Sequence, residues 1–105
     1  MKRSLLKEVP RDLPDELIEV LSCSESIRIE RIISLGHRSP DGAWYDQEAN
    51  EFVLLVRGRA GLSIEGEDDT VVLEEGDYVI LRAHVRHRVE WTDSERETIW
   101  LAVHY

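Results

Sequence analysis

The sequence has few of the features that mark secreted, membrane or nucleic-acid-binding proteins. A single cysteine, Cys23, allows no disulfide within the chain, which is typical of a reducing compartment. No apolar stretch approaches the length of a membrane span, and no signal peptide precedes the first polar residues. Basic residues number 13 against 22 acidic ones, and the net charge of -9 repels phosphate backbones. We therefore expect a cytoplasmic protein that binds neither nucleic acid nor membranes.

The motifs of several common enzyme classes are also missing. The chain contains no glycine-rich phosphate loop, no nucleophile elbow and no cysteine pair that could hold a structural zinc ion. Its hydrophobic share of 42% is ordinary for a folded protein. At 105 residues we expect a single domain spanning 1–105, because two separate cores would each be too small to be stable.

The first 25 residues differ in pattern from the rest of the chain. Pro14 follows a helix-capping candidate, Asp12, and the apolar residues Leu17, Ile18 and Leu21 then recur at helical spacing. We therefore predict one short amphipathic α-helix in the segment 1–25, with its apolar face packed on the body of the domain.

From residue 26 onward, short apolar runs with alternating character replace the helical spacing. Glycines and acidic turns separate these runs, and no long helical pattern lies between them. The expected strands cover residues 27–33, 51–57, 60–65, 70–73, 78–81, 87–92 and 98–105. Many short strands of this kind favour an antiparallel sandwich or barrel, so we predict a β-barrel over 26–105.

Two spaced motifs strengthen the prediction of a barrel. Six residues lie between Glu51 and Gly58, and ten residues lie between Gly76 and His87. These spacings resemble the two motifs of the cupin superfamily, and the chain is similar to small single-domain bacterial cupins. The resemblance implies an all-β, jelly-roll type of antiparallel barrel, here with the short N-terminal helix added. One fold hosts many functions, so it does not by itself imply a reaction.

The first motif departs from the family pattern. In cupins that bind metal, two histidines and the glutamate of the first motif join the histidine of the second around a divalent ion. Tyr45 and Gln47 stand where those two histidines are usual. If Glu51 faces the barrel interior, strand alternation places Gln47 and Tyr45 on the same side and Asp46 on the other. A β-bulge would reverse that choice, so Asp46 and Gln47 both stay candidates.

The resemblance implies a metal site made of Gln47, Glu51 and His87. Two oxygens and one nitrogen favour Mn, Fe, Ni or Zn over Ca, without deciding among them. His84 would supply a second imidazole, but it occupies a turn position where the family has glycine, so a turn role is the alternative. We expect Tyr45, Asp46 and His84 to be ligands or to lie beside the ligands.

Three further residues are candidates for the pocket wall. They are Trp44, Trp100 and His104, each in or beside an expected strand. Core or interface packing is the alternative role for the two tryptophans, because large aromatic side chains serve both purposes.

Two functions from different classes follow from these expectations. The first is a cupin that binds a divalent metal ion inside the barrel, with a small-molecule reaction of unassigned type and no catalytic residue identified. The second is a non-catalytic small-molecule binding or sensor module that needs no metal. We also expect a homodimer, because small barrels have open strand edges and aromatic-rich faces that a second copy covers.

Overall fold

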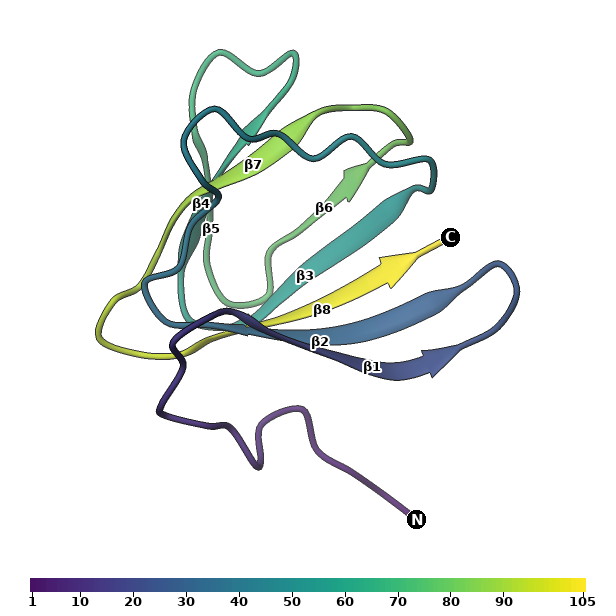
Figure 1. Cartoon of the computed structure of the whole chain (residues 1–105), viewed down its shortest axis with the longest axis vertical. Coiled ribbons are helices and arrows are strands. Elements are labelled where there is room, and N and C mark those ends of the chain that lie inside the picture. Colours follow the sequence, from purple (N-terminus) through teal and green to yellow (C-terminus); the bar gives the residue numbers. More distant parts are fainter.

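Two antiparallel sheets face each other in the computed structural model, which describes all 105 residues (Figure 1). The strands are β1 (Leu17–Cys23), β2 (Arg28–Ser34), β3 (Glu51–Arg57), β4 (Ala60–Ile64), β5 (Val71–Leu73), β6 (Tyr78–Leu81), β7 (His87–Thr92) and β8 (Thr98–His104). The larger sheet has the order β1-β2-β8-β3-β6, and the smaller has the order β5-β4-β7. The predicted all-β antiparallel architecture is therefore confirmed.

Alternation along β3 shows how the sequence produces the core. Glu51, Val53 and Leu55 are buried, whereas Phe52 and Leu54 between them are only half-buried. The inward apolar side chains of both sheets meet in one cluster, consisting of Val53, Leu55, Ala60, Leu62, Leu73, Leu81 and Trp100. Removal of these apolar surfaces from water is the main force that holds the two sheets together. Glu51 is the exception, because it places a carboxyl group on the face that is otherwise apolar.

The tight turn after β3 requires glycine. Gly58 has φ of 102°, a conformation that other residues rarely adopt. A Cβ atom there would lie 2.7 Å from the Cα atom of Thr98, at the start of β8. Gly58 therefore lets the β3–β4 turn pass directly over β8.

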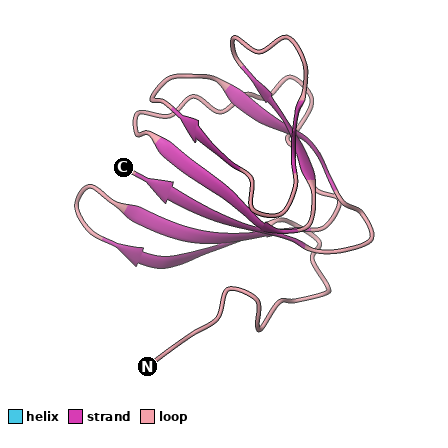
Figure 2. Cartoon of the chain, turned by 180° about the vertical axis from the view of Figure 1, so that it is seen from behind, coloured by secondary structure: helices cyan, strands magenta, loops and turns pink.

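The predicted N-terminal helix is wrong. No helix is present anywhere in the chain (Figure 2), and the segment 1–25 instead contains β1. β1 pairs with β2 from Leu17 opposite Ile33 to Cys23 opposite Arg28, with one register shift between Val20 and Ser22. The spacing of Leu17, Ile18 and Leu21 fits a short helix, but pairing with β2 satisfies both backbones and the β-branched residues suit a strand.

The residues before β1 lie across the outer face of the large sheet, below β1 and β2 in Figure 1. Arg31, on β2, holds them there. Its side chain is 7% exposed and pairs with Glu19 at 2.6 Å. The same guanidinium donates hydrogen bonds to the backbone carbonyls of Leu5, Lys7 and Glu8. A buried arginine, rather than the apolar face of the predicted helix, therefore fixes the N-terminal segment to the barrel.

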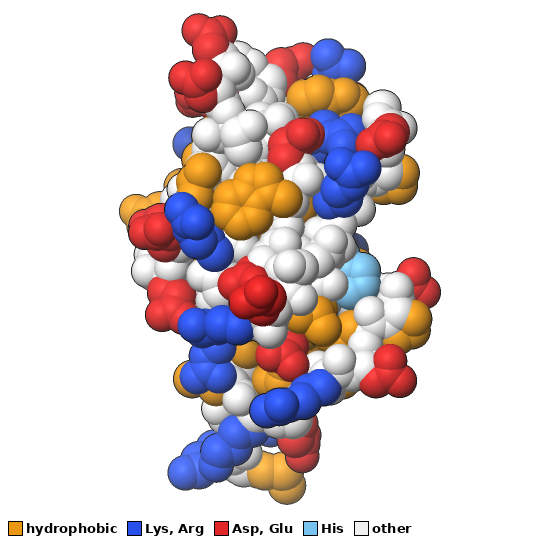
Figure 3. Space-filling view, turned by 90° about the vertical axis from the view of Figure 1, so that its left-hand side faces the viewer, with side chains coloured by type: hydrophobic (Ala, Val, Ile, Leu, Met, Phe, Trp, Pro, Cys, Tyr) orange, Lys and Arg blue, Asp and Glu red, His pale blue; other side chains and the backbone are white.

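The surface mixes charges of both signs. On the face shown in Figure 3, red acidic and blue basic side chains alternate around small hydrophobic patches. None of the chain forms a helix long and apolar enough to cross a lipid bilayer.

We predict that Arg31→Lys lowers the free energy of unfolding by about 2–4 kcal/mol, because lysine cannot reach the carboxylate and three carbonyls together. Urea denaturation would measure the loss. The matched control is Arg38→Lys, since Arg38 pairs with Asp41 at the surface, where the side chains are 59% and 87% exposed. The control should change stability by less than about 0.5 kcal/mol. Equal effects of the two substitutions would contradict the role given to Arg31.

Candidate functional site

The register of the large sheet sets a row of polar side chains across its inner face. Arg28 on β2 lies opposite His104 on β8, and His104 lies opposite Glu51 on β3. Glu51 in turn lies opposite Leu81 on β6. Residues directly opposite on neighbouring strands point to the same side of a sheet. One end of the inner face is therefore polar, whereas the rows beyond it carry the apolar core.

The small sheet and a loop close this end from the other side. His87, the first residue of β7, is 7% exposed and its ring stacks on that of Tyr45, with 5.4 Å between the ring centroids. Tyr45 and His87 also exchange backbone hydrogen bonds of 2.7 and 3.1 Å. Two residues further along, Gln47 is held by the hydrogen bond from His84 N to its carbonyl. The side chains of Tyr45, Gln47 and His87 all line the same cavity.

Arg88 fixes the loop that leads to Tyr45. Its guanidinium is buried beneath the loop and donates hydrogen bonds to the carbonyls of Ser39, Pro40 and Ala43. It also forms an ion pair with Glu90 on the same strand. A loop without regular structure is held in one position by these contacts, and that position determines where the next residues enter the cavity.

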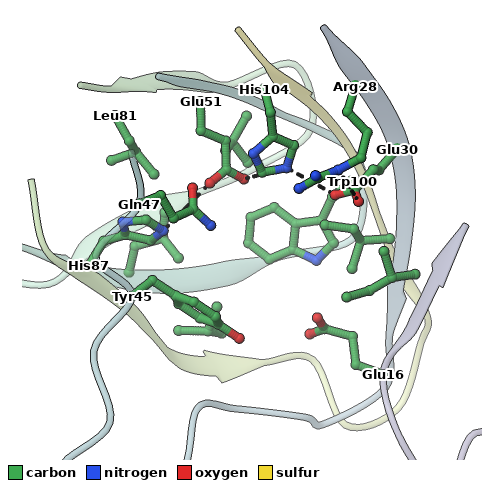
Figure 4. A pocket seen from close by; sticks show the side chains of 15 residues that line it. Glu16, Arg28, Glu30, Tyr45, Gln47, Glu51, Leu81, His87, Trp100 and His104 are labelled. Carbon is green, nitrogen blue, oxygen red and sulfur yellow. Dashed lines mark hydrogen bonds and ion pairs between the residues drawn. The ribbon is translucent and has the colours of Figure 1, made fainter. Parts of the chain in front are cut away.

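The cavity between the sheets has a volume of about 180 Å³. Fifteen residues line it: Glu16, Ile18, Arg28, Glu30, Ile32, Tyr45, Gln47, Glu51, Val53, Leu62, Leu81, His87, Val89, Trp100 and His104. Figure 4 shows Gln47, Glu51, His87 and His104 at one end, Trp100 along the wall and Glu16 at the far side, with the hydroxyl of Tyr45 turned toward Glu16. The space is polar at both ends and apolar between them, which is the usual composition of a small-molecule site.

Three lone pairs converge at the polar end. His87 Nδ1 lies 3.3 Å from the carbonyl of Val85, and because a carbonyl only accepts, Nδ1 carries the proton. The bare Nε2 of the neutral ring then faces Glu51 Oε1 at 3.6 Å. Glu51 Oε1 and Gln47 Oε1 are both buried without any hydrogen-bond partner. Buried acceptors without a donor are rare, and they mark a place where a cation, a proton or a ligand donor belongs.

Burial shifts the pKa values of both ionisable groups toward their neutral forms. The pKa of Glu51 is raised above 4.5, mainly by desolvation, although His104 acts in the opposite direction. The pKa of His87 is lowered below 6.5, again mainly by desolvation. Without a bound cation, the site therefore favours a neutral imidazole and resists the charged carboxylate.

His104 belongs to a separate network at the edge of the same end. Its Nε2 atom lies 2.9 Å from Glu30 Oε1 and 4.0 Å from Glu51 Oε2. Glu30 also accepts a hydrogen bond from Arg28 Nε at 2.9 Å. Because Nε2 is engaged with Glu30, His104 lines the cavity without presenting a free nitrogen to Glu51.

The structure separates the remaining sequence candidates. Trp100 lines the cavity, but Trp44 is 43% exposed and lies under the guanidinium of Arg86 instead. Asp46 points out of the cavity, where its Oδ1 lies 2.8 Å from Nδ1 of His84. Both of these side chains are more than half exposed. His84 occupies a left-handed turn with φ of 65°, the position at which the family pattern has glycine.

Glu16, Arg28 and Glu30 line the cavity but were not among the sequence candidates. Each face of the alternating β2 segment carries a charged residue, Glu30 on one and Arg31 on the other, so alternation could not show which face is inside. Glu16 lies just before β1, in a segment that the sequence pattern assigned to a helix. No local signal identifies it, because its position depends on the pairing of β1 with β2.

Comparison with known proteins agrees with the fold described above. A family model described as the cupin domain matches residues 34–104. No curated protein matches the sequence. A solved structure from Ralstonia eutropha JMP134, named a "putative mannose-6-phosphate isomerase", is 44% identical, with a TM-score of 0.96 over 99% of this chain and 96% of that one.

More distant structures share the fold alone. A cupin superfamily protein from Desulfitobacterium hafniense DCB-2 is 15% identical, with a TM-score of 0.74 over 91% of this chain and 82% of that one. An RmlC-like cupin family protein from Methanocaldococcus jannaschii is 19% identical, with a TM-score of 0.70 over 92% of this chain and 85% of that one. The barrel is thus common to proteins with little sequence in common.

We predict that Glu51→Gln stabilises the metal-free protein at pH 7 by about 1 kcal/mol, because it removes a buried charge and adds a donor beside Gln47. Because the pKa of Glu51 is raised in the folded state, its ionisation lowers the stability of the parent as pH rises above 4.5, and the variant lacks this one contribution. The difference should therefore shrink toward zero as pH falls to 4.5. Urea denaturation with chelator at both pH values would measure it.

The control for this substitution is Glu67→Gln, which removes a carboxylate from an exposed turn. It should leave stability almost unchanged at either pH. A Glu51→Gln variant that is less stable than the parent at pH 7 would show that the carboxylate is compensated in the metal-free protein.

Proposed function

The chain belongs to the cupin family, and from that premise we propose that it binds a divalent metal ion and a small organic ligand together at the polar end of the cavity. The proposed metal ligands are Gln47 Oε1, Glu51 Oε1 and His87 Nε2. Mn, Fe, Ni and Zn are the candidate ions, because two oxygens and one imidazole nitrogen suit this group better than they suit Ca.

One observation carries the proposal: an imidazole nitrogen, a carboxylate oxygen and an amide oxygen lie together at the polar end of the cavity, and both oxygens lack a hydrogen-bond partner. Two of these atoms, Gln47 Oε1 and Glu51 Oε1, are buried and unpartnered. The third, on His87, is oriented by the hydrogen bond from Nδ1 to the Val85 carbonyl. A hydrogen bond from the other ring nitrogen to a carbonyl is the usual way in which proteins orient a metal-binding histidine. A cation would satisfy all three atoms at once.

The protein ligands alone do not complete a coordination shell. No group of three or more His, Cys, Asp or Glu side chains lies close enough together to hold an ion. The proposed set contains one carboxylate, one imidazole and one neutral amide, so it leaves coordination positions open. Open positions are typical of sites where a ligand or substrate also coordinates the metal.

When bound, the ion supplies a Lewis acid that polarises an oxygen atom of the ligand. The residues of the chain have separate tasks. Apolar side chains such as Val53, Leu62 and Leu81 limit the access of water to the cavity. Glu30, which is paired with Arg28, holds His104 at the edge of the site, where its Nε2 atom lies 4.0 Å from Glu51 Oε2. Glu51 Oε2 is the carboxylate oxygen that is not a proposed metal ligand.

A metal-free binding module is the second candidate function. The engagement of His104 Nε2 by Glu30 favours it, since this removes the second imidazole from the metal set. In this case Glu51 holds a proton, which its raised pKa supports, and donates a hydrogen bond to Gln47 Oε1 or to a ligand. The two candidates share the cavity and differ only in what neutralises Glu51.

The name of the Ralstonia protein suggests sugar-phosphate isomerisation, but the charges in this cavity oppose it. Three carboxylates line the space, from Glu16, Glu30 and Glu51. The only arginine in the lining is Arg28, whose side chain is 50% exposed and paired with Glu30. Apart from the proposed metal ion, a phosphate group would meet no unpaired cation inside the cavity, so we do not extend that activity to this chain.

We also propose that the chain forms a homodimer through the outer face of β3 and β6. Tyr78 and Ile80 on the edge strand β6 are 60% and 47% exposed. Phe52 stacks on Tyr78, with 5.2 Å between the ring centroids. The outward side chains of β3 between Phe52 and Val56 are also apolar, so two copies of an acidic protein can meet here without bringing like charges together.

A cytoplasmic location is the remaining proposal. Cys23 is free and exposed. Exposed thiols persist in reducing compartments, where disulfides between chains do not accumulate.

We predict that Mn, Fe, Ni or Zn raises the melting temperature of stripped protein by about 5 °C or more at saturation, because the unfolded chain cannot assemble the site. A thermal scan with each ion would measure the shift. Glu51→Gln and His87→Gln should each abolish it. If no ion shifts the transition, or if Glu51→Gln shifts as much as the parent, the metal-free module is the better description.

Two matched controls separate the proposed ligands from their neighbours. His84→Gln removes an exposed imidazole that contacts only Asp46, and Asp46→Asn removes its partner. Both variants should keep the full metal-induced shift. Loss of the shift in either variant would mean that the turn at His84 or the side chain of Asp46 takes part in binding.

For the dimer, light scattering at high micromolar concentration should give twice the monomer mass. Ile80→Lys should reduce the mass to that of a monomer, because a buried lysine in an apolar interface has no partner. Val72→Lys is the control, since Val72 is 44% exposed on the other sheet. A monomeric parent protein would refute the proposal.

A further inference from the structure

Glu16 is a second acidic group in the cavity, at the side opposite to Glu51 and Gln47 (Figure 4). It lies immediately before β1, outside both family motifs. Its Oε2 atom accepts a hydrogen bond of 3.1 Å from the hydroxyl of Ser34. The Ser34 oxygen in turn accepts a hydrogen bond of 3.2 Å from the indole of Trp100.

This chain of hydrogen bonds gives the carboxylate a fixed orientation. Ser34 is fully buried and Trp100 is 4% exposed, so neither can move without disturbing the core. Ser34 has a single proton to donate, and the bond from Trp100 directs that proton to Glu16. Glu16 forms no ion pair with any arginine, lysine or histidine, and Ser34 is its only hydrogen-bond partner. Its remaining oxygen is available to whatever occupies the cavity.

Burial of such a group is unfavourable unless something satisfies it. Desolvation raises the pKa of Glu16, against smaller opposing effects of the Ser34 hydrogen bond and of the nearby His37. Trp100 would still donate to Ser34 without this carboxylate, whereas the buried Ser34 hydroxyl would lose its acceptor, so Glu16 satisfies one buried donor and keeps its other oxygen for the cavity. An unsatisfied group elsewhere in the cavity supports a ligand role independently: the Glu51 side chain is 9% exposed, and its Oε1 atom has no hydrogen-bond partner.

The two ends of the cavity therefore share one chemical character. Each presents hydrogen-bond acceptors, from Gln47 and Glu51 at one end and from Glu16 at the other. The walls between them are apolar, and include Ile32, Val53, Leu62, Leu81 and Val89. A volume of about 180 Å³ suits a molecule of roughly six to ten non-hydrogen atoms.

We propose that the cavity binds a short polyol or amino alcohol, or a diamine, whose end remote from the metal donates a hydrogen bond to Glu16, and that Glu16 excludes ligands with a phosphate at that end. This inference rests on the proposed small-molecule site and specifies its ligand class. Glu16 acts here as a specificity-determining residue, because a second anion beside it would be repelled in a poorly hydrated space. The opposite end keeps the metal ligands described above.

The test is calorimetric titration of the whole protein, with and without Mn, using erythritol, 1,4-diaminobutane and erythritol 4-phosphate as probes. Erythritol 4-phosphate differs from erythritol in both charge and size, so the contribution of charge is measured by how far Glu16→Gln reduces the difference in affinity between the two probes. We expect erythritol or the diamine to bind, and erythritol 4-phosphate to bind at least tenfold more weakly than erythritol. Glu16→Gln should weaken the donor-ended probes about tenfold, because it removes a charged acceptor while keeping the bond from Ser34.

Asp15→Asn is the matched control, since it removes the neighbouring carboxylate, which is exposed to solvent. It should bind all probes as the parent does. Glu16→Gln should melt no lower than the parent, so weaker binding would not reflect unfolding. The inference is wrong if the phosphate binds as tightly as erythritol, if Glu16→Gln binds as the parent does, or if neither donor-ended probe binds at about 10 mM.

Comparison with and without Mn keeps this inference separate from the metal proposal. Probe binding that depends on Glu16 but not on Mn would support the ligand class and refute the metal. A metal-induced thermal shift without Glu16-dependent probe binding would support the metal and refute the ligand class.

Discussion

The register of β8 with its two neighbours is the constraint on which the site depends. Because β8 lies between β2 and β3, His104 is opposite Arg28 on one side and Glu51 on the other. The rows farther along β8 contribute Ala102 and Trp100 to the core. A slip of one residue would turn every side chain of a strand to the opposite face. Packing of the apolar rows thus sets the register of β8, and the same register aligns the polar row. No further interaction is needed to align the polar side chains.

Two buried arginines extend this order to segments that have no regular structure. Arg31 binds three carbonyls of the N-terminal segment on the outside of the large sheet, and Arg88 binds three carbonyls of the loop between β2 and β3. The planar guanidinium has five donors in a fixed arrangement, so one side chain can fix several turns of irregular backbone. Each arginine also meets a carboxylate, from Glu19 or Glu90, which compensates the buried charge. The chain thereby holds both segments that supply residues to the cavity without using a helix.

The interior of the barrel combines a stable core with an end that is less stable than it could be. Glu16 and Glu51 both have raised pKa values because burial disfavours their charged forms. Apolar side chains of similar size at either position would avoid that penalty. Proteins commonly sacrifice some stability where binding requires unsatisfied groups. The only buried side-chain atoms without a hydrogen-bond partner are Gln47 Oε1 and Glu51 Oε1, and both belong to the cavity. The loss of stability is therefore located where a ligand would bind, which supports a binding role for the cavity.

Seven of the eight strands, and the positions of the two motifs, could be predicted from the sequence alone. The continuous apolar run from Phe52 to Val56, ended by Gly58, predicted β3 from Glu51 to Arg57, because a short apolar run before a glycine turn is typical of a strand. The motif spacing predicted that Glu51 and His87 belong to one site. In the structure they lie on different sheets, and both line the cavity. These features are local or depend on a fixed spacing, so they can be deduced without knowledge of the partners.

The strand β1 and the side chains that enter the cavity could not be predicted from local patterns, because they depend on tertiary contacts. Leu17, Ile18 and Leu21 fit a helix as well as a strand, and only the backbone groups of β2 made the strand favourable. Gln47 lines the cavity and Asp46 does not because Arg88 and the turn at His84 fix the loop from outside. Glu16 enters the cavity because Ser34 and Trp100, far away in the sequence, present a hydroxyl to it. Such contacts join residues that no local pattern relates, since their free energy arises only when the sheets have come together.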